Sequence, residues 1–150
     1  MTISVRELNP RTLSVIETSF ERTPDPHIWV REVEEFLLGS AARDLVRQRI
    51  RNLWLIEHDG TPVGLAANHQ HDEWAAELLQ AVMIDHRFRG HGLSRPVLET
   101  LLERIHATSG NQYIMWLVHP DNTAMRQVSA AISGEAGTPM SNGYIMFAHP

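Results

Sequence analysis

The chain has 150 residues, no cysteine and a formal net charge of −5 from 13 basic and 18 acidic residues. Its length is that of one ordinary domain, and the lack of cysteine excludes a disulfide framework, a thiolate nucleophile and a cysteine zinc site. The charge argues against a nucleic-acid binder, no apolar run is long enough to span a membrane, and the N-terminus lacks the layout of a secretory signal. We therefore expect a single cytoplasmic domain over residues 1–150 with no nucleic-acid or membrane partner.

The first third of the chain predicts one strand followed by helices. Residues 3–8 alternate in polarity and carry β-branched side chains, which favours a strand. A helix is expected to begin at Pro10, because proline is well placed in a first turn. After a proline-rich break over 21–27, apolar spacing predicts a second helix over 29–38, and 41–51 is expected to continue as a third.

The middle of the chain predicts three consecutive antiparallel strands. NLWLIEH, residues 52–58, is strand-like, and Asp59-Gly60 is the residue pair preferred in a type I′ turn. The chain is then expected to return over 62–71 and to turn again into a strand over 74–85.

The last third predicts helix, strand, helix and strand. Leucine, valine and isoleucine recur at helical spacing over 93–107, and the continuous apolar run at 113–119 predicts a strand buried on both faces. A helix over 123–133 and a closing strand over 144–148 follow. The short strand–helix–strand connection implies that 74–85 and 113–119 run parallel and lie close together, in an α+β domain with a mixed sheet.

The loop DHRFRGHGLS, residues 85–94, has the composition of a phosphate cradle. A loop that enters a helix exposes several backbone N–H groups, and the helix dipole adds partial positive charge. Gly90 and Gly92 leave the backbone bare, and Arg89 and Arg95 add charge at the rim.

Other interpretations of this loop stay open at this point. The dinucleotide-binding pattern requires a third glycine where Arg95 stands, and the P-loop pattern is absent. A glycine-rich turn with no ligand, or a generic phosphate-binding domain, also fits the loop.

Two segments together resemble the GNAT superfamily of acyl-CoA-dependent N-acetyltransferases. Residues 81–105, AVMIDHRFRGHGLSRPVLETLLERI, are similar to the family's motif A, and residues 113–125, YIMWLVHPDNTAM, resemble its fifth strand and the asparagine that follows. The motif positions that match are Ile84, Phe88, Arg89, Gly90, Gly92, Leu93, Val97 and Leu98. The order of the predicted elements agrees with the family over nearly the whole chain.

The resemblance implies a fold, a cofactor and residues that bind it. The fold is a mixed, mostly antiparallel central sheet flanked by helices, with one parallel strand pair at the cofactor cleft, and the co-substrate is acetyl-CoA. The residues that correspond to the family's pyrophosphate-binding backbone are Arg89, Gly90, His91, Gly92, Leu93 and Ser94, where Ser94 replaces the usual glycine or alanine. Those that correspond to its contacts with the pantetheine arm and thioester are Val82, Met83, Ile84 and Asn122, and the N–H of Met83 is a candidate donor to the thioester oxygen.

The proton donor for the departing thiolate is not in its usual place. Many family members carry a tyrosine seven residues after the asparagine, and that position here is Ser129. Ser129 is therefore the candidate donor, acting through water, and the alternative is a serine on a helix face with no role in the chemistry.

The general base is equally open. Family bases project from the strand before the loop, at positions that here hold Leu78 and Gln80. Glu77 is one residue away and would face the other side of the sheet unless a bulge shifts the register. We name Glu77 as the candidate base, the alternative being an edge or solvent-facing carboxylate.

Histidines supply further candidates. His69 and His71 share one face of a strand and could relay protons or bind a metal, but no carboxylate or cysteine completes a metal set, so we expect no metal and a wet strand end. His119 ends the strand beside the predicted cleft and is a candidate catalytic residue, the alternative being a strand-end cap before Pro120.

The resemblance places the acceptor between the first helices and the C-terminal hairpin. Glu21, Asp25, Trp29 and Tyr144 fall there, and acidic residues beside aromatic rings suit a cationic amine. The short C-terminal segment predicts a pocket that is open or completed by a second subunit in a homodimer. We expect an enzyme that acetylates a primary amine of a small molecule or protein by direct attack; the alternative is an acyl-CoA-binding module with weak or no catalysis.

Overall fold

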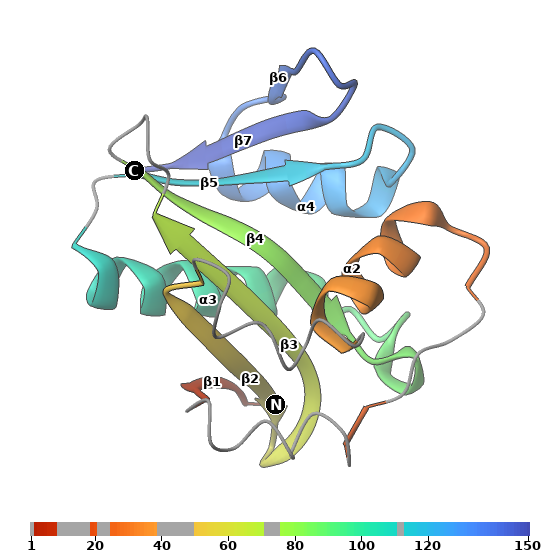
Figure 1. Cartoon of the computed structure of the whole chain (residues 1–150), viewed down its shortest axis with the longest axis vertical. Helices are drawn as coiled ribbons and strands as arrows, with labels where there is room; N and C mark the ends of the chain where they lie inside the picture. Colours follow the sequence, from red (N-terminus) through yellow and green to blue (C-terminus); the bar gives the residue numbers. More distant parts are fainter. Residues whose placement is uncertain (1, 9–18, 21–24, 39–49, 71–75, 111–112) are drawn as a thin grey trace.

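The computed structural model of the chain describes residues 2–8, 19–20, 25–38, 50–70, 76–110 and 113–150. These residues form one seven-stranded sheet in the order β1-β2-β3-β4-β5-β7-β6, in which β4 and β5 are the parallel pair and the other neighbours are antiparallel (Figure 1). The strands are β1 Ile3–Glu7, β2 Asn52–His58, β3 Thr61–Gln70, β4 Ala76–Ile84, β5 Tyr113–Val118, β6 Thr138–Pro139 and β7 Ile145–His149. The helices are α2 Ile28–Leu38, α3 Ser94–Ser109 and α4 Thr123–Ser133, with a short 3-10 turn, η3, at His86–Phe88.

This arrangement confirms the predicted α+β fold class with a mixed, mostly antiparallel sheet and one parallel pair. The bounds of the predicted elements agree with the observed ones to within two residues where the chain is described. Most of the helix expected to begin at Pro10 and of the helix expected over 41–51 lies outside the described residues, and residues 50–51, which are described, are not helical. Within the described part of the chain, no helix is long and apolar enough to cross a membrane.

The hairpin between β2 and β3 forms where the sequence predicts it. Asp59 and Gly60 have φ values of 50° and 83°. Positive φ at both central residues is the requirement of a type I′ turn, whose twist matches that of the flanking strands. Backbone groups of Thr2 stabilise the turn, because the N–H of Thr2 donates to Asp59 Oδ1 at 2.9 Å and the carbonyl oxygen of Thr2 accepts from the N–H of Asp59 at 2.9 Å.

Helices cover the two faces of the sheet in separate layers. α3 and α4 pack on one face, where their apolar side chains join Trp54 and Ile56 of β2. α2 lies on the other face, against β4, where Leu37 packs with Leu55 and Leu65 (Figure 1). Alternate side chains of β2 therefore reach opposite cores, as the period of two in a strand requires.

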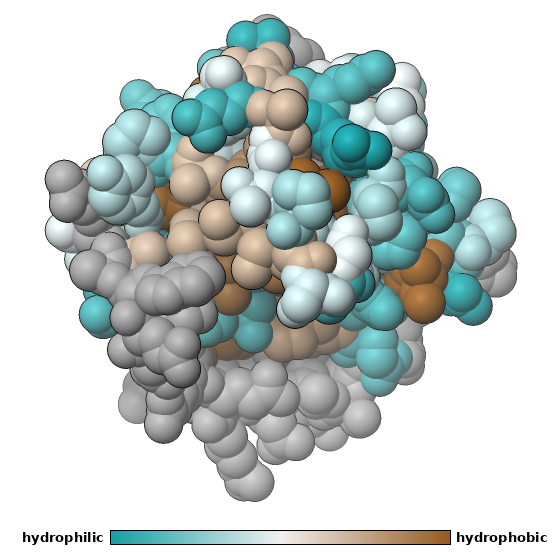
Figure 2. Space-filling view, turned by 90° about the horizontal axis from the view of Figure 1, so that it is seen from above, coloured by the Kyte–Doolittle hydropathy of each residue, from teal (hydrophilic) through white to brown (hydrophobic). Residues whose placement is uncertain are grey.

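The prediction that the strand at 113–119 is buried on both faces is wrong. Ile114, Trp116 and Val118 are buried under α3 and α4, whereas on the opposite face Met115 is buried but Tyr113 and Leu117 are 44% and 42% exposed. The described helix on that side, α2, packs on β4. Figure 2 shows apolar side chains gathered among polar ones at the end of the molecule where β5, β6 and β7 lie.

A bulge in β4 decides the shape of the sheet. Between Ala67 and Asn68 of β3, the partner on β4 changes from Ala81 to Leu79, so that Gln80 is an extra residue in β4. The parallel pairing of β4 with β5 ends at the same Leu79. A bulge bends and twists its strand, so β4 turns away from β5 beyond this point and the two strands part.

The turn that follows β4 is held by a buried carboxylate. Asp85 is 2% exposed, and its Oδ1 accepts bonds from the backbone N–H of Arg87 at 3.0 Å and from Arg87 Nε at 2.8 Å. Burial by itself raises the pKa of Asp85, but these hydrogen bonds and the charge of Arg87 outweigh it, so the pKa lies below its ordinary value of 3.8. The ionised carboxylate therefore stabilises the folded chain.

We expect Asp85→Asn to lower the free energy of unfolding by about 1 kcal/mol at about pH 7, because the substitution removes a charged acceptor. A carboxyl whose pKa is lowered by folding contributes stability above its unfolded pKa and loses it as the pH falls through the folded value. The gap between the two proteins should therefore close below about pH 4 in thermal melts. Asp121→Asn, at an exposed position, is the control and should show little effect at any pH.

Candidate active site

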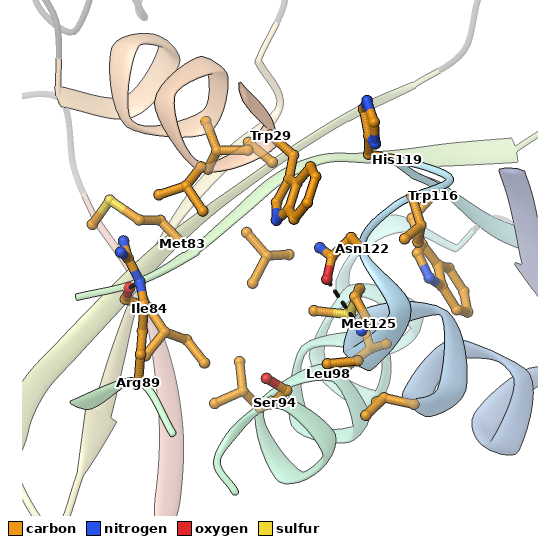
Figure 3. Close-up of a pocket in the computed structure, with 18 of the residues that line it drawn as sticks. Trp29, Met83, Ile84, Arg89, Ser94, Leu98, Trp116, His119, Asn122 and Met125 are labelled. Carbon is orange, nitrogen blue, oxygen red and sulfur yellow. Dashed lines mark hydrogen bonds between the residues drawn. The ribbon is translucent and has the colours of Figure 1, made fainter. Parts of the chain in front are cut away.

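A cavity of about 810 Å³ lies where β4 and β5 part. Its described walls come from α2, β4, the loop after β4, the beginning of α3, the end of β5 and α4. Figure 3 shows Trp29 of α2 and His119 from the end of β5 on one side, and Ser94 and Leu98 of α3 on the other. The cavity thus joins the glycine-rich loop to the face of the sheet that α2 covers.

The backbone of β4 turns alternate residues toward this cavity. Asp85 N–H donates to the carbonyl of Val63 at 2.7 Å, and a Cβ on Gly64 would collide with the carbonyl oxygen of Met83. Asp85 and Met83 therefore direct their backbone groups toward β3. Since the N–H and C=O of one strand residue point to the same edge, the N–H of Met83 is directed to β3 and away from the opening, which does not favour it as the donor to a thioester.

Val82 and Ile84 lie between these residues and direct their backbone groups toward the opening. The carbonyl of Ile84 already accepts a bond from Arg89 Nε at 2.8 Å. Val82, two residues beyond the bulge, is thus the residue of β4 whose N–H is best placed to bind a ligand that lies in the opening.

The glycine-rich loop has the conformation that the sequence predicts. Gly90 and Gly92 have φ values of 79° and 71°, and among the described residues no atom beyond their chain neighbours lies within 4 Å of where a Cβ would stand on either. Both line the cavity with Leu93 and Ser94 at the beginning of α3, whereas His91 lies outside the described lining. No described side chain caps the N-terminus of α3, so its first N–H groups are suited to an anion.

The side chain of Arg89 is used differently from the prediction. Its guanidinium lies 3.4 Å from carboxylate oxygens of both Asp25 and Glu34, in addition to its bond with Ile84. Glu34 is 2% exposed, so this ion pair is largely buried. Arg89 therefore ties the loop to α2, and the positive rim expected from it is neutralised; Arg95 stays at the rim beside Glu99, 3.0 Å away.

Asn122 lies on the cavity wall as the N-cap of α4. Its Oδ1 accepts from the backbone N–H of Met125 at 3.3 Å (Figure 3). The residue that matches the family's asparagine therefore also begins the helix, which explains why this residue type follows a strand at this point.

Ser129 is placed in the core beneath the cavity. It is fully buried, and its Oγ accepts a bond from Trp116 Nε1 at 2.8 Å. Trp116 lines the cavity, but Ser129 does not belong to the described lining. The geometry accounts for this hydroxyl as the partner of a buried indole.

Glu77 is also buried, so the alternative of an edge or solvent-facing carboxylate is wrong. Its carboxylate lies 3.1 Å from Arg51 Nε and accepts from Asn68 Nδ2 at 2.9 Å. It pairs with Ile114 in the part of the sheet where β4 and β5 are still joined. The bulge required by the prediction exists, but it does not bring Glu77 into the described cavity lining.

His119 does lie in the cavity wall, and the strand-end cap is confirmed as well. Its Nδ1 accepts from the backbone N–H of Asp121 at 3.1 Å. In a neutral imidazole that accepts at Nδ1, the proton is on Nε2, so the ring can donate a hydrogen bond there. Its ring lies 4.9 Å from that of Trp29 and 5.3 Å from that of Tyr144.

The remaining predicted histidines are not gathered at the cavity. His69 Nδ1 lies 3.0 Å from Gln80 Oε1, and His71 is outside the described residues. Within the described ranges, no three histidine, aspartate or glutamate side chains come together as metal ligands would.

The sequence predictions missed one charged residue of the cavity. Tyr144, predicted for the acceptor pocket, donates its hydroxyl to Glu32 Oε2 at 2.8 Å, and both residues line the cavity. Burial first, and then the hydrogen bond and charge of Glu32, raise the pKa of Tyr144 above 10.0, so it stays a phenol at neutral pH. Glu32 stands three residues after Trp29 on one helix, a spacing that could have indicated it. Glu21, the other acidic residue predicted there, lies outside the described residues.

A mixed sheet with one parallel pair that parts at a bulge, beside a glycine-rich helix start, defines the acetyltransferase class that the sequence resembles. The model of the acetyltransferase (GNAT) domain matches residues 9–133, so the chain belongs to the GNAT acetyltransferase family. Among curated proteins, no sequence matches the chain.

Solved acetyltransferases share the fold at low sequence identity. An aminoglycoside N-acetyltransferase, AAC(6')-Ib11, has a TM-score of 0.68 at 14% identity, over 99% of this chain and 96% of that one. The ribosomal-protein-S18-alanine N-acetyltransferase from Escherichia coli has a TM-score of 0.64 at 16% identity, over 99% and 94%. PaiA N-acetyltransferase from Thermoplasma acidophilum, in complex with coenzyme A, has a TM-score of 0.58 at 17% identity, over 99% and 98%.

We expect Ser129→Ala to destabilise the protein without removing its activity. Loss of the acceptor leaves the buried N–H of Trp116 unsatisfied, at a cost of about 1–3 kcal/mol in a denaturant titration. Turnover per folded molecule should stay close to that of the unmodified protein. Gln127→Ala, at an exposed position of the same helix, is the control. An unchanged stability together with a loss of about 100-fold in turnover would instead make Ser129 a proton donor.

Proposed function

We propose that the protein transfers the acetyl group of acetyl-CoA to a primary amine of a small molecule or protein, by direct attack within a ternary complex. The observation that carries the proposal is the cavity at the β4–β5 opening, which joins a helix N-terminus suited to a pyrophosphate to a separate side lined by α2 and Tyr144. The family match supports acyl transfer, and the acceptors in the names of the similar structures, an aminoglycoside and an alanine of a ribosomal protein, are amines.

The cofactor is proposed to lie along β4. Backbone N–H groups from Gly90 to Ser94 and the first turn of α3 would hold the pyrophosphate, and Asn122 would face the arm. The thioester oxygen gains negative charge as the amine attacks, and the N–H of Val82 is the donor that the strand directs into the opening. This assignment replaces the N–H of Met83.

The reaction forms a bond from the amine nitrogen to the acetyl carbon and breaks the bond from that carbon to sulfur. The nitrogen must be neutral before attack and loses a proton afterward, while the departing thiolate takes one up. His119 is proposed to stabilise the departing thiolate, because its neutral ring can donate a hydrogen bond from Nε2, and the proton that the thiolate takes up is proposed to come through water. The proton of the amine is proposed to leave through water at the open acceptor side, since the carboxylate of Glu77 is held by Arg51 and Asn68.

We propose further that residues 1–150 act as a single domain, in the cytoplasm, with acetyl-CoA and the amine as partners. The single sheet supports a single domain, and the absence of cysteine is consistent with the reducing conditions of the cytoplasm. A homodimer that completes the open acceptor side stays a prediction.

Isothermal titration with acetyl-CoA, followed by assays of CoA release over a panel of amines, tests the proposal. We expect binding and amine-dependent release. Tight binding with no release above background for any amine would support an acyl-CoA-binding module in place of an enzyme. If no acyl-CoA binds, both interpretations are wrong.

Gly92→Val tests where the cofactor lies. A Cβ at this position meets no protein atom, so the side chain would occupy the space proposed for the pyrophosphate and weaken acetyl-CoA binding at least about tenfold, or about 1.4 kcal/mol. The strain of a side chain at positive φ must be separated from this effect. Gly134→Val is the matched control, because Gly134 has φ of 77°, is equally open and lies outside the cavity lining. Equal affinities for the two variants would contradict the placement of the loop.

A further inference from the structure

The two ends of the cavity differ in charge. Among the described residues that line it, Glu32 is the one carboxylate, and Arg89 and Arg95 are the two arginines. Arg89 is matched by two carboxylates of its own, and Arg95, at the beginning of α3, is paired with Glu99. The loop end therefore suits a phosphate through its backbone N–H groups and the helix N-terminus, whereas the end between α2 and Tyr144 carries the charge of Glu32 with no described cation beside it.

Glu32 is held in position from the opposite wall. Tyr144 donates its hydroxyl to Oε2 at 2.8 Å, across 112 positions of sequence. Tyr144 is itself fixed by its turn, since its N–H donates to Asn142 Oδ1 at 3.0 Å and its carbonyl accepts from Met140 N–H at 2.8 Å. Within the described ranges no hydrogen bond or ion pair engages Oε1 of Glu32. One carboxylate oxygen is thus oriented and the other is left for a ligand.

The aromatic rings nearby are less suited to bind a cation than the sequence indicates. The ring of Trp29 is stacked on His27 at 4.5 Å and tilted against His119 at 4.9 Å. Because His27 stacks on one face of the indole and His119 lies against the ring, less of the indole is open to a cation. Recognition of a positive charge at this end therefore falls to Glu32.

A carboxylate in this position is expected to bind a charge that does not react. An ion pair with a carboxylate favours the protonated form of an amine, whereas the attacking nitrogen must be neutral. We propose that the acceptor is an amine with a second, non-reacting cationic group, which Glu32 binds while the first nitrogen attacks the thioester. This inference rests on the proposed function, since it names the acceptor class of the same site.

The bonds made and broken are those of acetyl transfer. The neutral terminal nitrogen gains the acetyl group and loses one proton, CoA leaves as a thiolate that takes up a proton, and the second ammonium stays paired with Glu32 throughout. Since the carboxylate takes no part in proton transfer, its removal should act on the choice of acceptor and leave the cofactor untouched.

The test compares primary amines of one chain length that differ at the far end. The acceptors are an α,ω-diaminoalkane and the amines that end in a methyl, a hydroxyl or a carboxylate group, each assayed for CoA release over a series of lengths. We expect kcat/KM for the diamine to exceed that of the hydroxyl analogue at least about tenfold at its best length, which corresponds to about 1.4 kcal/mol. Salt should reduce this ratio, because the pair is partly exposed to solvent.

Substitutions of Glu32 separate its role from that of the helix. Glu32→Gln should remove the preference for the diamine while the Kd of acetyl-CoA stays unchanged, and Glu32→Lys should shift the preference to the carboxylate-terminated amine. Glu35→Gln removes the same charge from an exposed position of α2 outside the cavity lining and should keep the preference. Tyr144→Phe, which removes the hydroxyl that orients Glu32, should reduce the preference in part.

The outcomes distinguish this inference from the proposed function. Release with equal kcat/KM for all chain ends, unchanged in Glu32→Gln, would overturn the inference and leave acetyl transfer standing. Failure of acetyl-CoA to bind would overturn the proposed function and this inference with it. If acetyl-CoA binds but release is too slow to measure, calorimetry of the diamine with the CoA-loaded protein decides: binding that Glu32→Gln abolishes supports the inference, and equal or absent binding in both proteins overturns it.

Discussion

The bulge at Gln80 is the constraint from which the site follows. If β4 and β5 stayed paired along their whole length, no gap would form between them, and their backbone N–H and C=O groups would all be engaged in hydrogen bonds between the strands. The extra residue in β4 coincides with the end of its pairing with β5 at Leu79, and the residues of β4 after Leu79 are not paired with β5. The opening, the backbone groups of Val82 that face it and the cavity beside it all depend on this single irregularity.

The side chain of Arg89 connects the glycine-rich loop to α2, which lines the proposed acceptor side of the cavity. Arg89 begins the loop, and its guanidinium contacts the carbonyl at the end of β4 and two carboxylates, Asp25 and Glu34, on the α2 side. Glu34 is buried, so loss of Arg89 would remove a cationic partner from a charge in the core. The arginine of the motif thus contributes through its side chain to the position of α2, while the proposed phosphate site consists of backbone N–H groups and the helix dipole.

His119 is proposed to take the place of the family's tyrosine as the hydrogen-bond donor to the departing thiolate. Ser129 occupies the position where the family has its tyrosine, and its hydroxyl accepts from the indole of Trp116. Tyr144 directs its hydroxyl to Glu32. His119, with its Nδ1 occupied by a backbone N–H, is the described cavity residue whose tautomer is set for donation.

Local patterns in the sequence were sufficient to predict the elements and the loop. Asp59-Gly60 forms its type I′ turn, and Gly90 and Gly92 adopt positive φ, because these conformations depend on the residues themselves. The short segment β6 was missed, since two residues in a glycine-rich region carry no strand pattern. Burial of the strand at 113–118 was overestimated, because an apolar run does not show which face a helix will cover.

The sequence by itself thus determined the family, the order of elements and the bare backbone of the loop, all of which reside in neighbouring residues. Only the tertiary structure decided what the charged and polar side chains do. The buried Glu77 forms an ion pair with Arg51, and Glu32 accepts a hydrogen bond from Tyr144, which is 112 residues away in the sequence. Such roles depend on a one-residue bulge and on which distant elements pack together. Neither produces a periodic pattern or a residue spacing that can be recognised in the sequence.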